Sequence, residues 1–226
     1  MPADFVPMAE HTGLITPLTK HVLDLALDQI ATWRDQGKHL SVAVNLSARS
    51  FLDSQLLEEE LPAMLAQHKI DPALLELEIT ESMIVGDPER VRGVLEGLNQ
   101  LGVTVAIDDF GTGYSSLAYL RDLPVDEIKI DRSFVLEMQG ERSGETIVRS
   151  IIDLAHNLDL RAVAEGVEDQ MLLTRLTELG CDTAQGYYIS RPLPAGRFEA
   201  WLESYPLRTT WLTDSGSQPL DLPAVA

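Results

Sequence analysis

The feature that most constrains the fold of this chain is an alternation of short strand-like runs with longer helical segments. Six runs rich in β-branched residues lie at 40–46, 75–80, 103–108, 126–130, 161–165 and 183–189. Apolar residues recur at helical spacing over 17–36, before the first run, and over 87–101 and 145–158, between later runs. This order predicts an α/β fold of parallel strand–helix units, and its repetition favours a barrel or a doubly wound sheet over two unlike domains.

The length and composition are compatible with one such domain. Single α/β barrels often reach ~250 residues, and this chain has 226. With 45% hydrophobic and 23% charged residues it has the composition of a folded protein, which excludes intrinsic disorder and a disulfide scaffold. The alternation fades after about Trp201. We therefore expect one domain over residues 1–205 and a loosely held tail over 206–226.

The charge of the chain limits its partners and its location. Seventeen basic against 36 acidic residues give a net charge of −19, which repels nucleic acids and anionic membranes. Cys181 is the single cysteine, so neither an intrachain disulfide nor a cysteine-based metal site can form. Neither a secretory leader nor a long apolar run is evident. We expect a cytoplasmic protein that binds no nucleic acid and has no membrane segment.

Polar residues gather where the strand-like runs end. The set, taken in chain order, is Asn45, Glu78, Asp108, Asp109, Asp131, Glu165 and Gln185. In a parallel β/α architecture the carboxyl ends of the strands form one rim, where active sites are built. Lys129 lies two residues before Asp131 and should point the same way. An acid at one strand end is more often a helix cap or a surface charge, but a series of five is unusual.

So many carboxylates on one rim require a cation, because like charges a few ångströms apart repel strongly. Carboxylate and amide oxygens select Mg²⁺, Mn²⁺ or Ca²⁺ over zinc and copper. The number of acids is more than one octahedral ion usually recruits, which indicates two adjacent cations. Two-cation sites commonly bind phosphate esters and activate a water. The pattern therefore predicts a phosphate-directed metal site.

Two further features leave alternatives open. The glycine-rich segment 111–116 could be a mobile loop beside the metal site, followed by a short helix over 115–121, or a plain tight turn. Lys129 could form a Schiff base, but neighbouring acids would push its pKa up rather than down. We therefore expect Lys129 to hold a water or a phosphate.

Six motifs in this order resemble those of the EAL-domain family, bacterial phosphodiesterases that linearise cyclic di-GMP. They are Asn45-Leu-Ser-Ala-Arg49, Glu78-Ile-Thr-Glu-Ser82, Asp108-Asp-Phe-Gly-Thr-Gly-Tyr-Ser-Ser116, Lys129-Ile-Asp-Arg-Ser-Phe134, Ala164-Glu-Gly-Val-Glu168 and Gln185-Gly-Tyr with Ser190-Arg-Pro-Leu-Pro194. The resemblance runs from about Pro2 to Leu202. It implies a modified TIM-type (β/α)₈ barrel with one antiparallel strand.

The resemblance also implies roles for individual residues. The ligands of two divalent cations, Mg²⁺ or Mn²⁺, would be Asn45, Glu78, Asp108, Asp131 and, for the second cation, Asp109. Glu165 would position or deprotonate the attacking water, and Lys129 would hold that water or the phosphate. Glu81 would anchor the 111–116 loop, which in the family also makes dimer contacts. The substrate side would be formed by Gln185, acting through a water, and by Arg191 and Pro192 at the guanine pocket.

One departure from the family pattern concerns the start of the chain. The Glu-Ala-Leu signature is absent, and Met1-Pro-Ala-Asp-Phe5 resembles the stretch that follows it. The resemblance then implies that the first two barrel strands are missing, together with a metal-binding glutamate and a phosphate-binding arginine. We expect about six strands, an open barrel edge, and a homodimer or other association through that edge.

Two functions follow from this comparison of motifs. The first is a cyclic di-GMP phosphodiesterase that produces linear pGpG with a metal-activated water. The second is an impaired EAL domain that senses cyclic di-GMP or binds a protein partner without hydrolysis. The retained acids and Lys129 favour the enzyme, and the missing signature favours the sensor.

Overall fold

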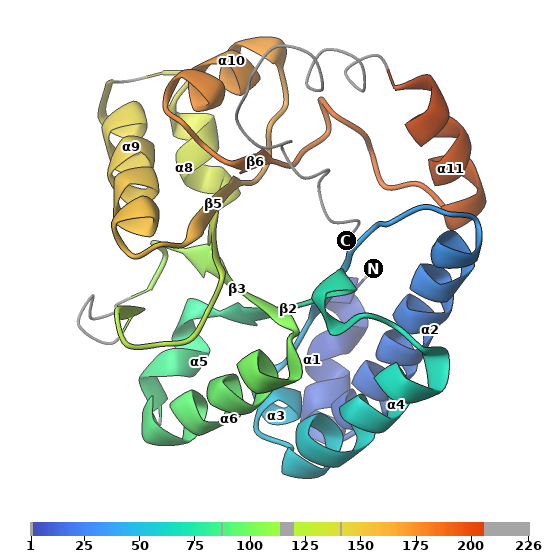
Figure 1. Ribbon diagram of the computed structural model, residues 1–226. Coiled ribbons are helices and arrows are strands. Elements are labelled where there is room, and N and C mark those ends of the chain that lie inside the picture. Colours follow the sequence, from blue (N-terminus) through green and yellow to red (C-terminus); the bar gives the residue numbers. More distant parts are fainter. Residues whose placement is uncertain (1, 87, 114–119, 141, 206–226) are drawn as a thin grey trace.

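The strands of the computed structural model, which describes residues 2–86, 88–113, 120–140 and 142–205, form one sheet. In chain order they are β1 (Val42–Asn45), β2 (Leu75–Thr80), β3 (Thr104–Phe110), β4 (Glu127–Ile130), β5 (Arg161–Ala164) and β6 (Thr183–Ala184). They also lie in this order in the sheet, and all five neighbouring pairs are parallel. The sheet curls into a half-barrel with helices around its outside (Figure 1). The predicted α/β, barrel-type fold is confirmed.

Helices follow or precede each strand, as parallel connections require. Before β1 lie α1 (Pro2–Thr12) and α2 (Ile15–Asp35). The connections to β3 contain α3 (Ala48–Phe51), a π-helical turn (Gln55–Glu60), α4 (Leu61–His68), a 3₁₀ turn (Pro72–Leu74), α5 (Glu81–Gly86) and α6 (Pro88–Leu101). Among the described residues, the later helices are α8 (Arg132–Glu137), α9 (Arg142–Asn157), α10 (Gln170–Glu178) and α11 (Ala195–Ser204).

The sequence of β2 shows how one strand separates the core from the interior of the half-barrel. Side chains alternate along a strand, so Leu75, Leu77 and Ile79 share one face. All three are fully buried in the apolar layer between the sheet and the helices. Glu76 and Glu78 share the opposite face, inside the half-barrel. The strand therefore carries acids inward without interrupting the core.

A row of aromatic rings joins α11, the last described helix, to α2. The ring centroids of Trp33 and Phe198 are 5.4 Å apart, and Phe198 lies 5.5 Å from Trp201. Trp201 in turn lies 4.6 Å from Tyr205, and the indole N–H of Trp33 donates to Glu199 (3.2 Å). In Figure 1, the beginning of α11 accordingly lies next to the end of α2. This contact connects the two ends of the half-barrel through its helical layer.

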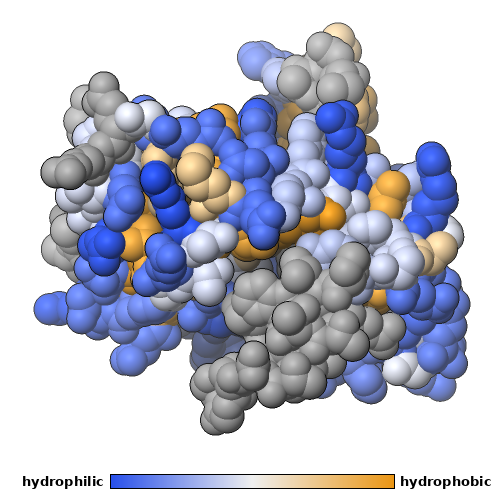
Figure 2. All heavy atoms as spheres, turned by 90° about the horizontal axis from the view of Figure 1, so that it is seen from above, coloured by the Kyte–Doolittle hydropathy of each residue, from blue (hydrophilic) through white to orange (hydrophobic). Residues whose placement is uncertain are grey.

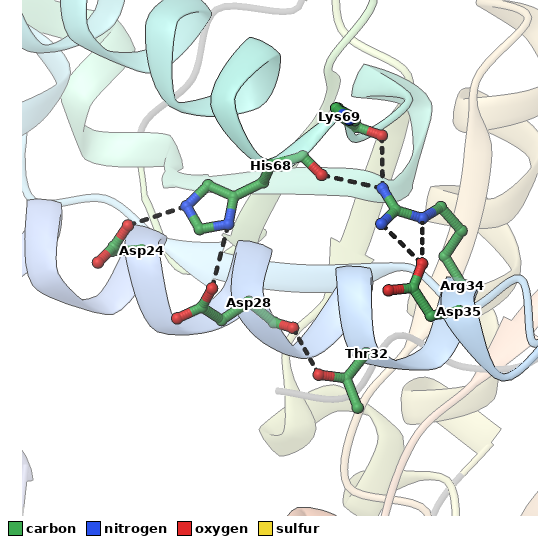
Figure 3. Close-up of polar contacts among 7 residues, drawn as sticks. All are labelled: Asp24, Asp28, Thr32, Arg34, Asp35, His68 and Lys69. Atoms are coloured by element: carbon green, nitrogen blue, oxygen red, sulfur yellow. Dashed lines mark hydrogen bonds and ion pairs between the residues drawn. The ribbon is translucent and has the colours of Figure 1, made fainter.

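A second polar contact fixes α4 on α2 (Figure 3). His68 at the end of α4 lies between two carboxylates of α2, with Nε2 3.0 Å from Asp24 and Nδ1 3.1 Å from Asp28. Arg34 donates to the carbonyls of His68 (2.9 Å) and Lys69 (2.7 Å). These carbonyls lack helical partners, so α2 supplies the hydrogen bonds that the end of α4 requires.

The prediction of a strand over 183–189 is wrong beyond its first residues. Only Thr183–Ala184 pair with β5, and the chain then turns. The cause is a close backbone contact at Gly186, where a Cβ atom would lie 2.2 Å from the nitrogen of Val167. The predicted helix over 115–121 falls mostly in 114–119, and that segment and the predicted tail over 206–226 lie outside the described residues.

The surface agrees with the acidic composition. Seen from above, most of the described residues on this face are hydrophilic, and hydrophobic residues show between them (Figure 2). Within the described parts of the chain, we find no helix that is both long enough and apolar enough to cross a membrane.

Candidate metal centre

Lys129 lies at the centre of a charged cluster inside the half-barrel. Its side chain is buried on β4, and its ammonium group forms an ion pair with Glu78 of β2. Lys129 Nζ lies 2.7 Å from Glu165 Oε1, directly after β5, and 3.6 Å from Asp108 Oδ1 on β3. Three other strands, β2, β3 and β5, thus bring their predicted residues to the lysine of β4.

Asn45 extends this cluster to the first strand. It pairs in register with Glu78, and its side-chain Nδ2 donates to Glu78 Oε2 (2.5 Å). One oxygen of Glu78 therefore faces Lys129 and the other faces Asn45. The buried carboxylate is satisfied from both sides, which buried charges require.

A β-bulge places two consecutive aspartates in one site. The register between β3 and β4 shifts between Ile107 and Phe110, and Asp109 has a left-handed φ of 54°. A regular strand would send neighbouring side chains to opposite faces, whereas a bulge redirects one of them. As a result, carboxylate oxygens of Asp108, Asp109 and Glu165 lie within 4.8 Å of one another.

These three carboxylates fit a divalent cation. Burial, followed by repulsion from Asp108 and Asp131, raises the pKa of Asp109 above its usual value. Asp131 Oδ1 accepts the backbone N–H of Ser133 (3.0 Å) and so caps α8. The helix-cap interpretation of an acid at a strand end is therefore correct for Asp131, which also lies beside Asp109. Oxygen ligands of this kind suit Mg²⁺, Mn²⁺ or Ca²⁺.

The protonation of Lys129 follows from its neighbours. Burial acts to lower its pKa, but Glu78, Glu165 and Asp108 together raise it above its usual value. Lys129 therefore remains an ammonium ion and is unsuited to form a Schiff base. Burial also raises the pKa of Glu165, against the opposing effect of Lys129. A carboxylate whose pKa is raised is a stronger proton acceptor than an ordinary glutamate.

Glu81 holds the start of the glycine-rich segment. It is the first residue of α5 and is buried. Its Oε2 accepts the backbone N–H groups of Gly111 (2.8 Å) and Gly113 (3.3 Å). Gly111 has a φ of 99°, which glycine adopts without strain. Of the predicted loop 111–116, residues 114–116 lie outside the described residues.

The three residues predicted for the substrate side follow β6. The backbone N–H of Gln185 donates to the carbonyl of Ala164 (2.8 Å), and its carbonyl accepts the N–H of Val167 (3.0 Å). The backbone of Gln185 is therefore hydrogen-bonded to residues on both sides of Glu165 in the sequence. Arg191 and Pro192 are exposed, and the guanidinium carbon of Arg191 lies 5.2 Å from the ring centroid of Tyr187. The ion pairs that Lys129 forms within the described residues involve Glu78, Asp108 and Glu165, and none of the three substrate-side residues.

The sequence interpretation missed two buried acids next to this cluster. Glu76 and Glu127 are buried, and Glu127 pairs with Arg161. Burial, together with Glu127 and Glu78, raises the pKa of Glu76 to about 8, against the effect of Lys129 and Arg161. The signal was present in the two-residue period of each strand, which places Glu76 with Glu78 and Glu127 with Lys129.

This shifted pKa predicts a stabilising substitution, Glu76→Gln. The folded state binds the Glu76 proton more tightly than the unfolded state, so stability is lost as the pH rises from the ordinary value of 4.5 towards about 8. We expect Glu76→Gln to raise the free energy of unfolding by about 2 kcal/mol near neutral pH and to have little effect at about pH 4. Urea denaturation in EDTA across this range measures the difference, with exposed Glu59→Gln as the control. Parallel pH curves for wild type and Glu76→Gln would contradict the prediction.

Comparison with known proteins agrees with this geometry. The family model described as "EAL domain" matches residues 1–192. The chain is 42% identical over 205 residues to the signaling protein YkoW of Bacillus subtilis, covering 91% of this chain and 26% of that one. It is 42% identical over 201 residues to the cyclic di-GMP phosphodiesterase PA2567 of Pseudomonas aeruginosa, covering 89% and 34%. The chain thus spans about a quarter to a third of the length of these relatives.

A solved structure shares the fold over most of both chains. The structure named "PaMucR Phosphodiesterase, c-di-GMP complex" superposes with a TM-score of 0.84 at 43% identity, covering 88% of this chain and 80% of that one. The family match and this similarity extend over the strands that carry the cluster. The chain therefore belongs to the EAL-domain family.

Proposed function

We propose that this chain hydrolyses cyclic di-GMP to linear pGpG. The observation that carries the proposal is Lys129, held as an ammonium ion between Glu78 and Glu165 beside the oxygens of Asp108 and Asp109. A cation next to a cluster of hard oxygen ligands suits an anionic phosphodiester. The relatives named as cyclic di-GMP phosphodiesterases support this choice of substrate.

We assign the cation ligands from the residues that converge on the rim. Mg²⁺ or Mn²⁺ would be held by Asn45, Glu78, Asp108 and Asp131, and a second ion by Asp109. The donor chemistry fits, because the set consists of carboxylates and one amide. Oxygens of two of its members, Asp108 and Asp109, lie within 4.8 Å of each other and of Glu165. When bound, such an ion lowers the pKa of a water and neutralises phosphate charge.

The chain's own residues have separate roles in the proposed hydrolysis. Glu165 accepts a proton from the water that attacks phosphorus. Lys129 donates to that water or to a phosphate oxygen and so keeps the two reactants aligned. The phosphorus–oxygen bond to the 3′ oxygen breaks and that oxygen takes up a proton, which leaves pGpG with its 5′ phosphate. Glu81 holds the glycine-rich segment, and the substrate is bound by Gln185, Arg191 and Pro192.

We further propose that the protein acts in the cytoplasm and associates as a homodimer or through an open sheet edge. β1 and β6 are the terminal strands of the described sheet. Terminal strands present backbone groups with which another chain can pair. A concentration-independent monomer in size-exclusion chromatography would exclude this association.

Incubation of the purified chain with cyclic di-GMP tests the proposed hydrolysis. Chromatography should detect pGpG with Mn²⁺ or Mg²⁺ and none after EDTA treatment. Calorimetry on the same samples measures binding separately from turnover. Binding without product would replace the phosphodiesterase by the sensor, and the absence of both would overturn the proposal.

A further inference from the structure

We infer that Arg132 is a positioning residue for Glu165, and this inference rests on the proposed function. Arg132 is the first residue of α8 and directly follows Asp131. It reaches across to the turn at 165–168 that follows β5. Two separate contacts join its side chain to that turn, one through its aliphatic stem and one through its guanidinium group.

The stem of Arg132 packs on the backbone of Gly166, the neighbour of Glu165. A Cβ atom at Gly166 would lie only 2.1 Å from Arg132 Cγ and 2.8 Å from its Cβ. Gly166 also has a φ of 70°, a conformation that favours glycine. The absence of a side chain at Gly166 therefore lets Arg132 lie directly against the backbone next to Glu165.

The guanidinium group holds the far end of the same turn. Arg132 forms an ion pair with Glu168 at 2.5 Å. On the other side of the turn, Val167 donates its N–H to the carbonyl of Gln185 (3.0 Å) and lies against Gly186. The turn is thus held between Arg132 on one side and the segment after β6 on the other.

This arrangement positions the side chains of Lys129 and Glu165 relative to the end of β4. β4 carries Lys129, whose Nζ lies 2.7 Å from Glu165 Oε1, and the same strand leads directly to Arg132. Glu165 itself is joined to β4 by one backbone hydrogen bond, from its N–H to Ile130 (3.2 Å). Arg132 supplies the additional contacts that keep Glu165 at its distance from Lys129.

Steady-state kinetics of Arg132→Gln test this role. We expect kcat to fall about 10- to 100-fold with little change in KM, because small misplacements of a reacting group reduce turnover. The exchanged pair Arg132→Glu with Glu168→Arg should restore much of the rate. The matched control is Arg149→Gln, because the Arg149–Glu145 pair is equally exposed, at 55% and 38% against 56% and 39%. A normal kcat in Arg132→Gln would overturn the inference.

Amide hydrogen exchange gives a readout that does not depend on turnover. In EDTA, Arg132→Gln should speed the exchange of the Glu165 and Val167 amides about 3- to 10-fold and leave the core of the sheet unchanged. Arg149→Gln should leave both amides unaffected. If the wild type does not hydrolyse cyclic di-GMP, the proposed function is wrong. The exchange rates of Arg132→Gln would still show whether Arg132 holds Glu165 in place. Unchanged exchange, or faster exchange throughout the protein, would contradict it.

Discussion

Substitution of Lys129 by methionine is expected to lower the free energy of unfolding by about 3–5 kcal/mol. Methionine keeps the length and apolar character of the stem but removes the ammonium group. The buried carboxylate of Glu78 then loses its ion pair, and Glu165 loses a contact of 2.7 Å. Removing one member of a buried pair leaves an uncompensated charge, which costs far more than the pair itself contributes.

Urea denaturation in EDTA measures this loss. The matched control is Lys20→Met, which breaks the exposed pair with Glu60 and should cost less than about 1 kcal/mol. Adding Glu78→Gln to Lys129→Met should recover part of the stability, because it removes the unpaired charge. Lys129 contributes below its ordinary pKa of 10.5 and loses its effect only as the pH rises through its raised value, so the deficit should be constant around neutral pH. Equal losses in Lys129→Met and Lys20→Met would refute this account of the cluster.

Glu165→Gln is expected to reduce kcat about 1000-fold, which is within the range that general acid–base groups contribute. Glutamine keeps the shape of the side chain but cannot accept a proton. The wild-type rate should also fall on acidification at a higher pH than an ordinary glutamate would produce, because burial raises the pKa of Glu165 and the group must be ionised. Formation of pGpG measured against pH gives both results.

The control for this experiment is Glu178→Gln, an exposed substitution on α10. It should retain the wild-type rate and pH profile. Calorimetry with cyclic di-GMP shows whether Glu165→Gln still binds its substrate, as a purely chemical role requires. A rate within a few-fold of wild type would exclude Glu165 as the proton acceptor.

The periodicity of the sequence predicted the first five strands well, because their apolar runs are bounded by turn signals, and only β6 is much shorter than predicted. β2 has the predicted bounds, 75–80. β3 extends beyond the predicted 103–108 to Phe110, because the bulge lets the pairing with β4 resume after Asp109. The left-handed backbone conformation of Asp109 does not change the spacing of apolar residues, so it cannot be predicted from that spacing. The residues of the candidate site could be predicted because they lie at strand ends, but the backbone geometry that brings Asp108 and Asp109 together could not be predicted.

Other differences arise from contacts between distant segments. The end of the strand at Ala184 depends on the approach of Gly186 to Val167, and the role of Arg132 depends on Gly166. Neither pairing is encoded in a local pattern. Glu76 was a different case, since the alternation Leu-Glu-Leu-Glu already placed it beside Glu78. Glu76 is absent from the predicted site because it lies within β2, whereas the predicted residues were those near strand ends.

The aromatic row between α2 and α11 has an optical consequence. Trp33 and Trp201 both belong to it, and they are two of the three tryptophans of the chain. Their emission should therefore shift to the red when α11 leaves α2 and water reaches the indoles. Intrinsic fluorescence thus reports whether the aromatic row that joins the two ends of the half-barrel is intact, independently of any assay of turnover.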